Sequence, residues 1–335
     1  MKYYNEKLIR SLRIVLATLI AELIYIYYKE PHYAWVFITI YVVLFDQATI
    51  GATFYKGFLR LMATISGGTV GFLTLFIFKN NELANSIAIL LTSLVYSYIF
   101  INQKQSYIGV LGLATLAMIL VGNSEMGIAL YRIGNILLGI IIALIVTLVF
   151  FPQSAEKVTL KLIYSSITKL RDTMEILLEQ NNDKKIIQQH FDKIEAGILA
   201  ELSNLVKSID EIKYEGKSQK RLYYLDALRA IRRIYRIITV LFQSEAYIGI
   251  LDDKDIVCKL TKLQNYYTNL FKVIQNKQYN LDLINQIVNI SNLSNTHHDV
   301  VFIHNLIDRI YIETNILVNS INQARNSNKL YNQNI

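Results

Sequence analysis

Three arginines in apolar surroundings are the residues of this sequence most able to do chemistry. Arg13, Arg60 and Arg132 each lie near the start of a long apolar stretch. An arginine stays protonated and presents a planar fork of donors that can pair with a carboxylate in two places. A guanidinium in hydrocarbon costs about 2.5–3.5 kcal/mol on insertion scales, so these side chains should face protein, water or an anion rather than lipid. They predict recognition of organic anions within a membrane.

A structural role is the alternative for the same arginines. Side chains near the ends of membrane helices can extend to the lipid headgroups and only fix the orientation of the helix, and Arg10 fits this description best. Glu22 lies deeper in the first apolar stretch. It could pair with an arginine, which we favour, or act as a proton-coupling carboxylate.

Small residues recur in the third apolar stretch. Ala63, Gly67 and Gly71 follow one another every four residues. On a helix this spacing forms a groove in which another backbone can approach closely, a common mode of helix packing in membranes. We therefore expect these residues to pack against a second helix.

The third and sixth apolar stretches resemble each other. Arg60 precedes Gly67, and Arg132 precedes Gly139 at nearly the same distance. Three spans separate the two stretches, so they would cross the membrane in opposite directions, as in inverted-repeat transporters with a site between the repeats. Arg60 would then lie toward the cytoplasmic mouth and Arg132 toward the outer one.

Aromatic residues decorate the second apolar stretch, where Tyr33, Trp35 and Tyr41 lie. Such residues usually belong to the interfacial belt of a membrane protein or to its packing. They could also line a path for aromatic acids, and the sequence does not decide between these roles.

The charged residues are divided unevenly along the chain. Up to Phe151 there are ten Lys and Arg and six Asp and Glu, out of totals of 34 and 26. Both halves have a net charge of +4, so the basic excess is spread along the chain. There is no basic tail of the kind that binds nucleic acid, and no nucleic-acid partner is expected. We predict an all-α protein with a transmembrane domain over residues 1–152 and a soluble helical domain over residues 153–335.

Six transmembrane helices are expected in the first domain. The apolar segments are 11–28, 32–45, 57–78, 83–102, 107–121 and 127–151. The second and fifth are short against the ~20 residues needed to cross hydrocarbon, so flanking polar residues should extend them. One side of an alternating topology receives Lys2, Lys7, Arg10, Arg13, Lys56, Arg60, Lys104, Lys157 and Lys161, and the other receives only Lys29, Lys79 and Arg132. The positive-inside rule places both termini in the cytoplasm. We expect the protein in the inner (plasma) membrane.

Helical periodicity continues after Pro152, where the apolar run stops. The expected helices are 154–180, 183–213, 218–245, 253–276, 280–292 and 298–325. Apolar stripes are formed by Ala227, Ile231, Ile234, Ile238 and Leu241 and by Ile303, Leu306, Ile310 and Leu317. A cluster of Arg229, Arg232, Arg233 and Arg236 could gather anions or contact anionic lipid, but a solvated face paired with Asp210, Glu211 or Glu215 is the favoured interpretation.

No catalytic or cofactor-binding motif is present. The sequence lacks a P-loop, GxSxG, HExxH or paired cysteines, so we expect neither an enzyme nor a cofactor. His297, His298, Asp299 and His304 lack the spacing of a metal site, and no metal is expected. The single Cys258 is compatible with a cytoplasmic second domain.

Two segments resemble a known family. AWVFITIYVVLFDQATIGATFYKGFLRLMATISGGTVG, residues 34–71, is similar to the early membrane signature of the fusaric acid resistance (FUSC) proteins, the bacterial aromatic acid exporters and the plant aluminium-activated malate transporters. YRIGNILLGIIIALIVTLVFFP, residues 131–152, resembles the last membrane helix of that family. The second half of the chain is similar only in being helical.

The resemblance implies a six-helix membrane domain and a cytoplasmic helical domain that together move organic anions such as aromatic or dicarboxylic acids. It also implies that Arg13 and Arg132 match basic residues lining the anion path. Larger members have two copies of this unit and this chain has one, so a homodimer is expected, with Gly67 and Gly71 packing within or between subunits.

The leading hypothesis is therefore an inner-membrane transporter or channel that exports organic anions along a path of arginines. One alternative is a membrane anchor whose helical domain binds a partner without transport. Another is the inner-membrane subunit of a multi-component efflux pump.

Overall fold

The structure, a computed structural model, describes residues 2–30, 32–78, 81–103, 105–121, 126–178, 184–243, 254–275 and 298–331. The regular elements of these residues are helices, without a strand among them, as the sequence predicts. The chain divides into two compact units, Met1–Ser154 and Ala155–Ile335. The division falls just after Pro152, where the apolar run of the sequence stops.

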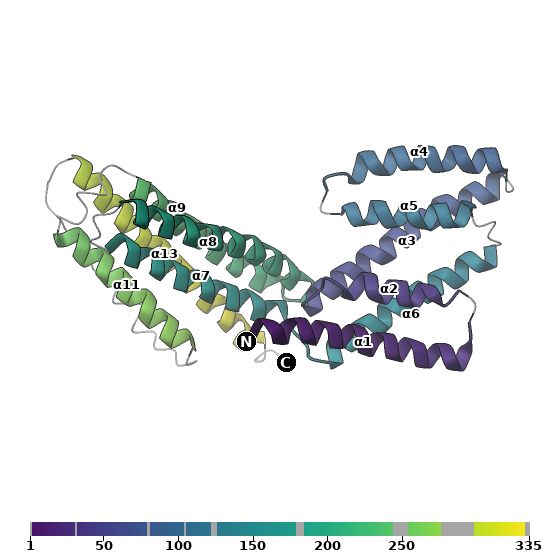
Figure 1. Cartoon of the computed structure of the whole chain (residues 1–335), viewed down its shortest axis with the longest axis horizontal. Helices are drawn as coiled ribbons and strands as arrows, with labels where there is room; N and C mark the ends of the chain where they lie inside the picture. The colour runs from purple at the N-terminus through teal and green to yellow at the C-terminus, as the bar shows by residue number, and fades with distance from the viewer. Residues whose placement is uncertain are drawn as a thin grey trace. The chain divides into compact units, whose positions relative to one another are not determined.

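The first unit contains six helices in its described residues (Figure 1). They are α1 (Lys2–Tyr28), α2 (Ala34–Leu44), α3 (Ile50–Phe78), α4 (Glu82–Phe100), α5 (Ser106–Val121) and α6 (Met126–Val149). Helix α3 begins seven residues before the expected position 57, because its glycines and threonines resemble a loop in sequence. Thr49 supports this early start, since its hydroxyl accepts a hydrogen bond from the backbone N–H of Ala52 at 3.1 Å.

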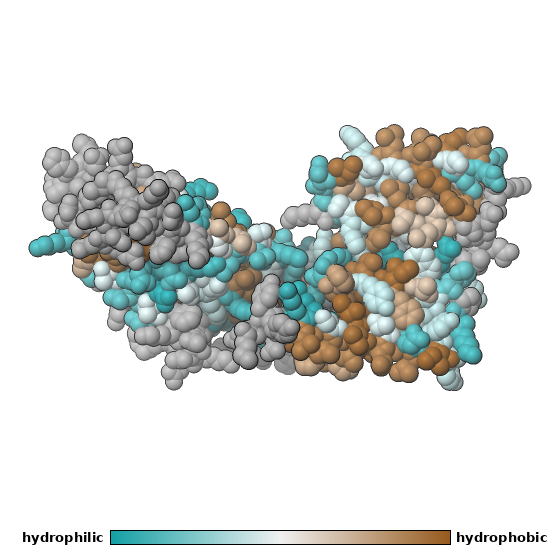
Figure 2. Space-filling model, in the orientation of Figure 1, coloured by the Kyte–Doolittle hydropathy of each residue, from teal (hydrophilic) through white to brown (hydrophobic). Residues whose placement is uncertain are grey.

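The first unit has the surface of a membrane protein. Three of its described helical segments are long and apolar enough to cross a membrane, namely α3, α4 and residues 131–149 of α6. Helices α2 and α5 are apolar but shorter, with 11 and 16 residues. Apolar residues gather on the surface of this unit, notably over α1 and α4 (Figure 2), and all but six of the large exposed apolar side chains of the described residues belong to it. The six-span layout remains a prediction.

Helices α3 and α5 approach each other at the level of their backbones. A Cβ atom added to Gly67 would lie 2.0 Å from the carbonyl oxygen of Gly112 on α5. One turn further along α3, Gly71 packs against the side chain of Ile119, whose Cγ2 would lie 3.0 Å from a Cβ atom added to Gly71. Ala63 is also fully buried. The groove of small residues expected on α3 therefore lies against α5 of the same chain, and Gly112 is a partner that the sequence analysis missed.

Helices α2 and α6 form a second close pair. A Cβ atom at Gly139 would lie 2.8 Å from the backbone oxygen of Val36 and 2.8 Å from Cβ of Thr39. Around this contact the side chains of Ile40, Ile136 and Ala143 are buried in a shared apolar core. Gly139 thus allows the backbone of α6 to lie against α2.

The second unit is a bundle of long helices (Figure 1). They are α7 (Ala155–Leu178), α8 (Lys184–Ile212), the short η1 (Lys213–Glu215), α9 (Ser218–Gln243), α11 (Lys254–Gln275) and α13 (His298–Tyr331). The predicted stripe on α9 is buried throughout, and Ile303, Ile310 and Leu317 of the stripe on α13 are buried with it in one core. The expected helix 280–292 lies outside the described residues, and α13 extends six residues beyond the expected end.

The arginine cluster of α9 is an exposed face with local ion pairs. Arg229 pairs with Asp226 at 2.8 Å, and Arg233 pairs with the buried Glu313 of α13 at 3.1 Å. Asp210, an expected partner, pairs instead with Arg221 at 2.7 Å. The favoured interpretation of a solvated, paired face fits these contacts, although the acids differ from those expected.

A partly buried ionic network joins the start of α7 to the start of α9. The Glu156 carboxylate accepts hydrogen bonds from Lys217 at 2.8 Å, Lys220 at 2.6 Å and the Tyr224 hydroxyl at 3.3 Å. Burial alone would raise the pKa of Glu156, but the hydrogen bonds from Lys217 and Lys220 outweigh it and hold this pKa below its ordinary value of 4.5. The network therefore stabilises the fold only while Glu156 is ionised.

We predict that Gly67→Ala destabilises the protein, whereas Gly68→Ala does not. The new methyl group of Gly67→Ala would overlap backbone atoms of Gly112, which cannot rotate away, at a cost of about 1–3 kcal/mol or more. Gly68 has no atom within 4 Å of the corresponding position, so alanine there should stabilise the helix by about 0.5–1 kcal/mol. Melting temperatures of the purified variants in detergent would measure both effects. Equal melting of the two variants would contradict the α3–α5 contact.

We also predict that the stabilising effect of Glu156 depends on pH. The folded-state pKa is lowered, so its contribution is present above pH 4.5 and is lost as the pH falls through the folded-state value. Glu156→Gln should lower the melting temperature at pH 7. The difference in melting temperature between this variant and the wild type should shrink below pH 4.5. Glu175→Gln, at an exposed position of the same helix, is the control. A difference for Glu156→Gln that stays constant down to pH 3 would show that the network has no such role.

Candidate functional site

Arg13 is a buried clamp between distant parts of the first unit. Its side chain is 2% exposed, and its guanidinium donates to three backbone carbonyls. Nη1 donates to Ala48 at 2.9 Å, Nε donates to Phe150 at 3.2 Å, and Nη2 donates to Phe151. The last two carbonyls follow the end of α6, where a positive charge is favoured by the helix dipole. All three nitrogens are therefore engaged within the protein, and the predicted role of Arg13 in an anion path is untested.

Arg60 is buried without a compensating charge. Its side chain is 2% exposed, and its Nε has no hydrogen-bond partner among the described residues. In the described part of the chain no carboxylate forms an ion pair with it. A buried guanidinium in this state retains donors that an anion could use.

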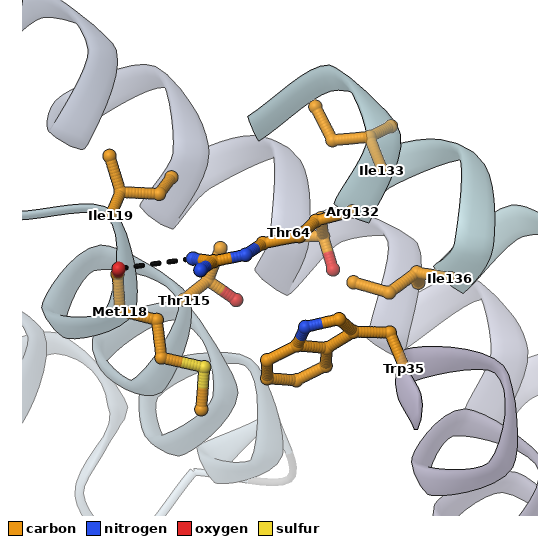
Figure 3. A pocket seen from close by; sticks show the side chains of 8 residues that line it. All are labelled: Trp35, Thr64, Thr115, Met118, Ile119, Arg132, Ile133 and Ile136. Carbon is orange, nitrogen blue, oxygen red and sulfur yellow. Dashed lines mark hydrogen bonds between the residues drawn. The ribbon is translucent and has the colours of Figure 1, made fainter. Parts of the chain in front are cut away.

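Arg132 lines a small cavity between four helices (Figure 3). The cavity is bordered by Trp35 of α2, Thr64 of α3, Thr115 and Met118 of α5, and Arg132 of α6, and its volume is about 20 Å³. Arg132 Nη1 donates to the carbonyl of Met118 at 3.0 Å. The guanidinium carbon lies 5.9 Å from the centroid of the Trp35 ring, within the range of a cation–π contact. A space of this volume admits about one water molecule, so an organic acid would require the helices to move apart.

Arg60 and the cavity lie along the same face of α3. Thr64 borders the cavity, and its hydroxyl donates to the backbone carbonyl of Arg60 at 2.9 Å, one turn earlier. Residues four apart on a helix share a face and are separated by about 6 Å along its axis. The structure therefore arranges Arg60 and the Arg132 cavity in succession along α3.

The charges buried in the first unit are positive. Among the side chains of this unit whose burial is described, Arg13 and Arg60 are the buried charged ones, and the acidic ones, Glu22, Glu30, Asp46 and Glu82, are exposed. Uncompensated charge is costly in a medium of low dielectric constant, and an anion drawn from solution would remove that cost. The interior of this unit thus favours anions over cations.

Glu22 lies on the outer surface of α1. It is exposed, and it borders a shallow groove of about 600 Å³ formed mainly by apolar side chains of α1 and by Tyr41. No ion pair joins it to an arginine within the described residues, so the expected ion pair is not observed. A proton-coupling role for Glu22 stays a prediction.

Thr115 is a site residue that the sequence analysis missed, and Trp35 is one whose role it left open. For Trp35 the sequence leaves open whether it belongs to packing, to the interfacial belt or to a path for aromatic acids, and in the structure its ring lies against Arg132. Thr115 lies between apolar residues of α5, and its place at the cavity follows from the glycine contact between α3 and α5. The described residues contain no group of three possible metal ligands, and His297 lies outside them.

Comparison with protein families identifies the chain. The model of the fusaric acid resistance protein family matches residues 7–244, which extends from α1 to the end of α9. The chain belongs to this family. Curated protein sequences give no match. Membership in FUSC, together with the apolar helices, makes this a membrane protein of a transporter family rather than of an enzyme family.

We predict that Arg13→Lys destabilises this FUSC protein. A lysine ammonium cannot reproduce the planar fork that reaches three carbonyls, and each lost charge-assisted hydrogen bond costs about 1.5–3 kcal/mol. Arg10→Lys is the matched control, because Arg10 lies one turn earlier on α1 and its Nε has no partner among the described residues. The melting temperature in detergent should fall for Arg13→Lys and stay near the wild-type value for Arg10→Lys. The clamp would be refuted if both variants melted like the wild type.

Proposed function

We propose that this protein exports organic anions, such as aromatic or dicarboxylic acids, across the inner membrane through the bundle of α2, α3, α5 and α6. The observation that supports this most directly is the buried, uncompensated guanidinium of Arg60. Family membership supports transport in general, and the charge of the buried residues supports anions as the cargo.

The arginines would replace the water that a carboxylate loses on entering the bundle. A carboxylate leaving water for an apolar medium loses strong hydrogen bonds, and an arginine fork returns two of them. Arg60 has donors free for this purpose, and Arg132 has one nitrogen bound to Met118 in the closed cavity. When the cavity opens, an anion would take the place of that carbonyl.

Trp35 would make the cavity suitable for an aromatic acid. Its indole ring already lies against a planar cation, and an aromatic ring of the substrate could stack on its other surface while the carboxylate pairs with Arg132. The excess of lysine and arginine on one side of the predicted topology supports cytoplasmic termini, with Arg60 at the cytoplasmic end of the path.

Flux measurements in proteoliposomes test the proposal. Benzoate and succinate would be supplied with and without a pH gradient, and electrical recording would separate passive from proton-coupled movement. We expect Arg132→Ala and Arg60→Ala each to reduce flux about 10–150-fold, the equivalent of one charge-assisted interaction of about 1.5–3 kcal/mol.

Arg229→Ala is the control for this measurement, because Arg229 lies on an exposed face of the second unit and pairs with Asp226. Its flux should equal that of the wild type. The proposal fails if folded Arg132→Ala and Arg60→Ala protein transports both acids at the wild-type rate, and such a result would favour a membrane anchor.

A further inference from the structure

A second residue near Arg60 has a buried polar group without a partner among the described residues. The hydroxyl of Tyr107, on α5, has no hydrogen-bond partner among the described residues. Gly67 meets Gly112 and Gly71 meets Ile119, so α3 and α5 run in the same direction, and Tyr107, five residues before Gly112, lies near the level of Arg60, seven residues before Gly67. A phenol hydroxyl buried alone gives up its hydrogen bonds to water, a loss of about 1–3 kcal/mol that folding normally avoids. Two such groups near the same level of α3 and α5 call for a common explanation.

Lys56 fixes the position of the Tyr107 ring independently. The Lys56 ammonium lies 5.0 Å from the centroid of that ring, and Lys56 precedes Arg60 by one turn on α3. The same face of α3 thus presents Lys56 and Arg60 toward Tyr107. Asp46, at an exposed position, reaches Lys56 only at 4.0 Å, the limit of an ion pair.

The groups that remain free at this place are hydrogen-bond donors. Arg60 has only donors, and the Tyr107 hydroxyl can donate its proton while its oxygen stays close to a cation. A water molecule could accept both hydrogen bonds but would leave the charge of Arg60 uncompensated, whereas a carboxylate has two oxygens, one for the guanidinium and one for the hydroxyl, and a negative charge. The set therefore favours an anion with two acceptor oxygens.

We propose that Arg60 and Tyr107 together bind one carboxylate of the transported acid, at a site on α3 and α5 that is separate from the Arg132 cavity. The inference rests on the proposed function, since the ligand is the same class of anion. Tyr107 is then a specificity-determining residue. A carboxylate uses both groups, whereas chloride, a single spherical acceptor, can be held by Arg60 alone.

The substitution Tyr107→Phe tests this inference, because it removes the hydroxyl and keeps the ring against Lys56. We expect the apparent affinity for benzoate and succinate to fall about 10-fold, the value of one hydrogen bond of about 1.4 kcal/mol, while chloride flux changes little. Tyr98→Phe is the matched control, since Tyr98 is 90% exposed on α4, and it should behave like the wild type. Equilibrium binding of the same acids to the full chain in detergent would be measured by calorimetry alongside flux.

The outcomes separate this inference from the proposed function. If the wild type transports the acids and Tyr107→Phe binds them equally well, the inference is wrong and the proposed function stands. If the wild type binds the acids without transporting them, and Tyr107→Phe binds them more weakly, the site stands and the transport function fails. If the wild type neither binds nor transports them, both are wrong.

A second variant covers the case in which Tyr107→Phe does not fold. Arg60→Lys keeps the charge but loses the fork, so it should lose the preference for carboxylates over chloride. Retention of that preference in folded Arg60→Lys protein would overturn the site.

Discussion

Two helix backbones approach closely in lipid only where their side chains are small, and α3 meets α5 in this way at Gly67 and Gly112. Lipid tails are as apolar as leucine, so the hydrophobic effect does not drive two helices together in a membrane. Close van der Waals packing has to provide the free energy of their association. This contact aligns α5 against the face of α3 that presents Arg60 and Thr64. The Tyr107 hydroxyl and the Arg132 cavity both owe their place to it, which makes the packing of glycines a condition for the chemistry.

The second constraint is electrostatic. Among the residues described, the interior of the first unit has buried arginines but no buried carboxylates. Each buried positive charge costs free energy unless carbonyl oxygens, an aromatic face or a bound anion compensates it. Arg13 meets this requirement with three backbone carbonyls, and Arg132 meets part of it with one carbonyl and the face of Trp35. Arg60 does not meet it. Three arginines that look alike in sequence therefore differ in how much of their charge is left for a ligand.

Much of the fold follows from the sequence because periodicity and proline are local signals. The all-helical class, the family and the stripe on α9 could be predicted, since each depends on residue types at fixed spacing. The start of α3 could not, because its glycines and threonines are helical only through contacts that the sequence does not display. The partners of Arg13 are backbone carbonyls more than thirty residues away. Every residue has a backbone carbonyl, so the residue types in the sequence do not reveal which carbonyls accept these hydrogen bonds. Likewise, Trp35 and Arg132 are separated by most of the first unit and meet only because α2 packs on α6 at Gly139.

The clamp of Arg13 has a mechanical consequence. It ties the first helix of the unit to the end of the last one, and the backbone N–H of Ile50 donates to Gln153 at 3.0 Å, which attaches the start of α3 to the same place. Three helices are thus anchored at one end of the unit by four hydrogen bonds. In the N-terminal half of α6 the described side-chain ties are fewer, namely Arg132 to the carbonyl of Met118 at 3.0 Å and Asn135 to the carbonyl of His32 at 3.2 Å. A widening of the Arg132 cavity would then be a splaying about this anchored end, and its amplitude would grow with distance from Arg13.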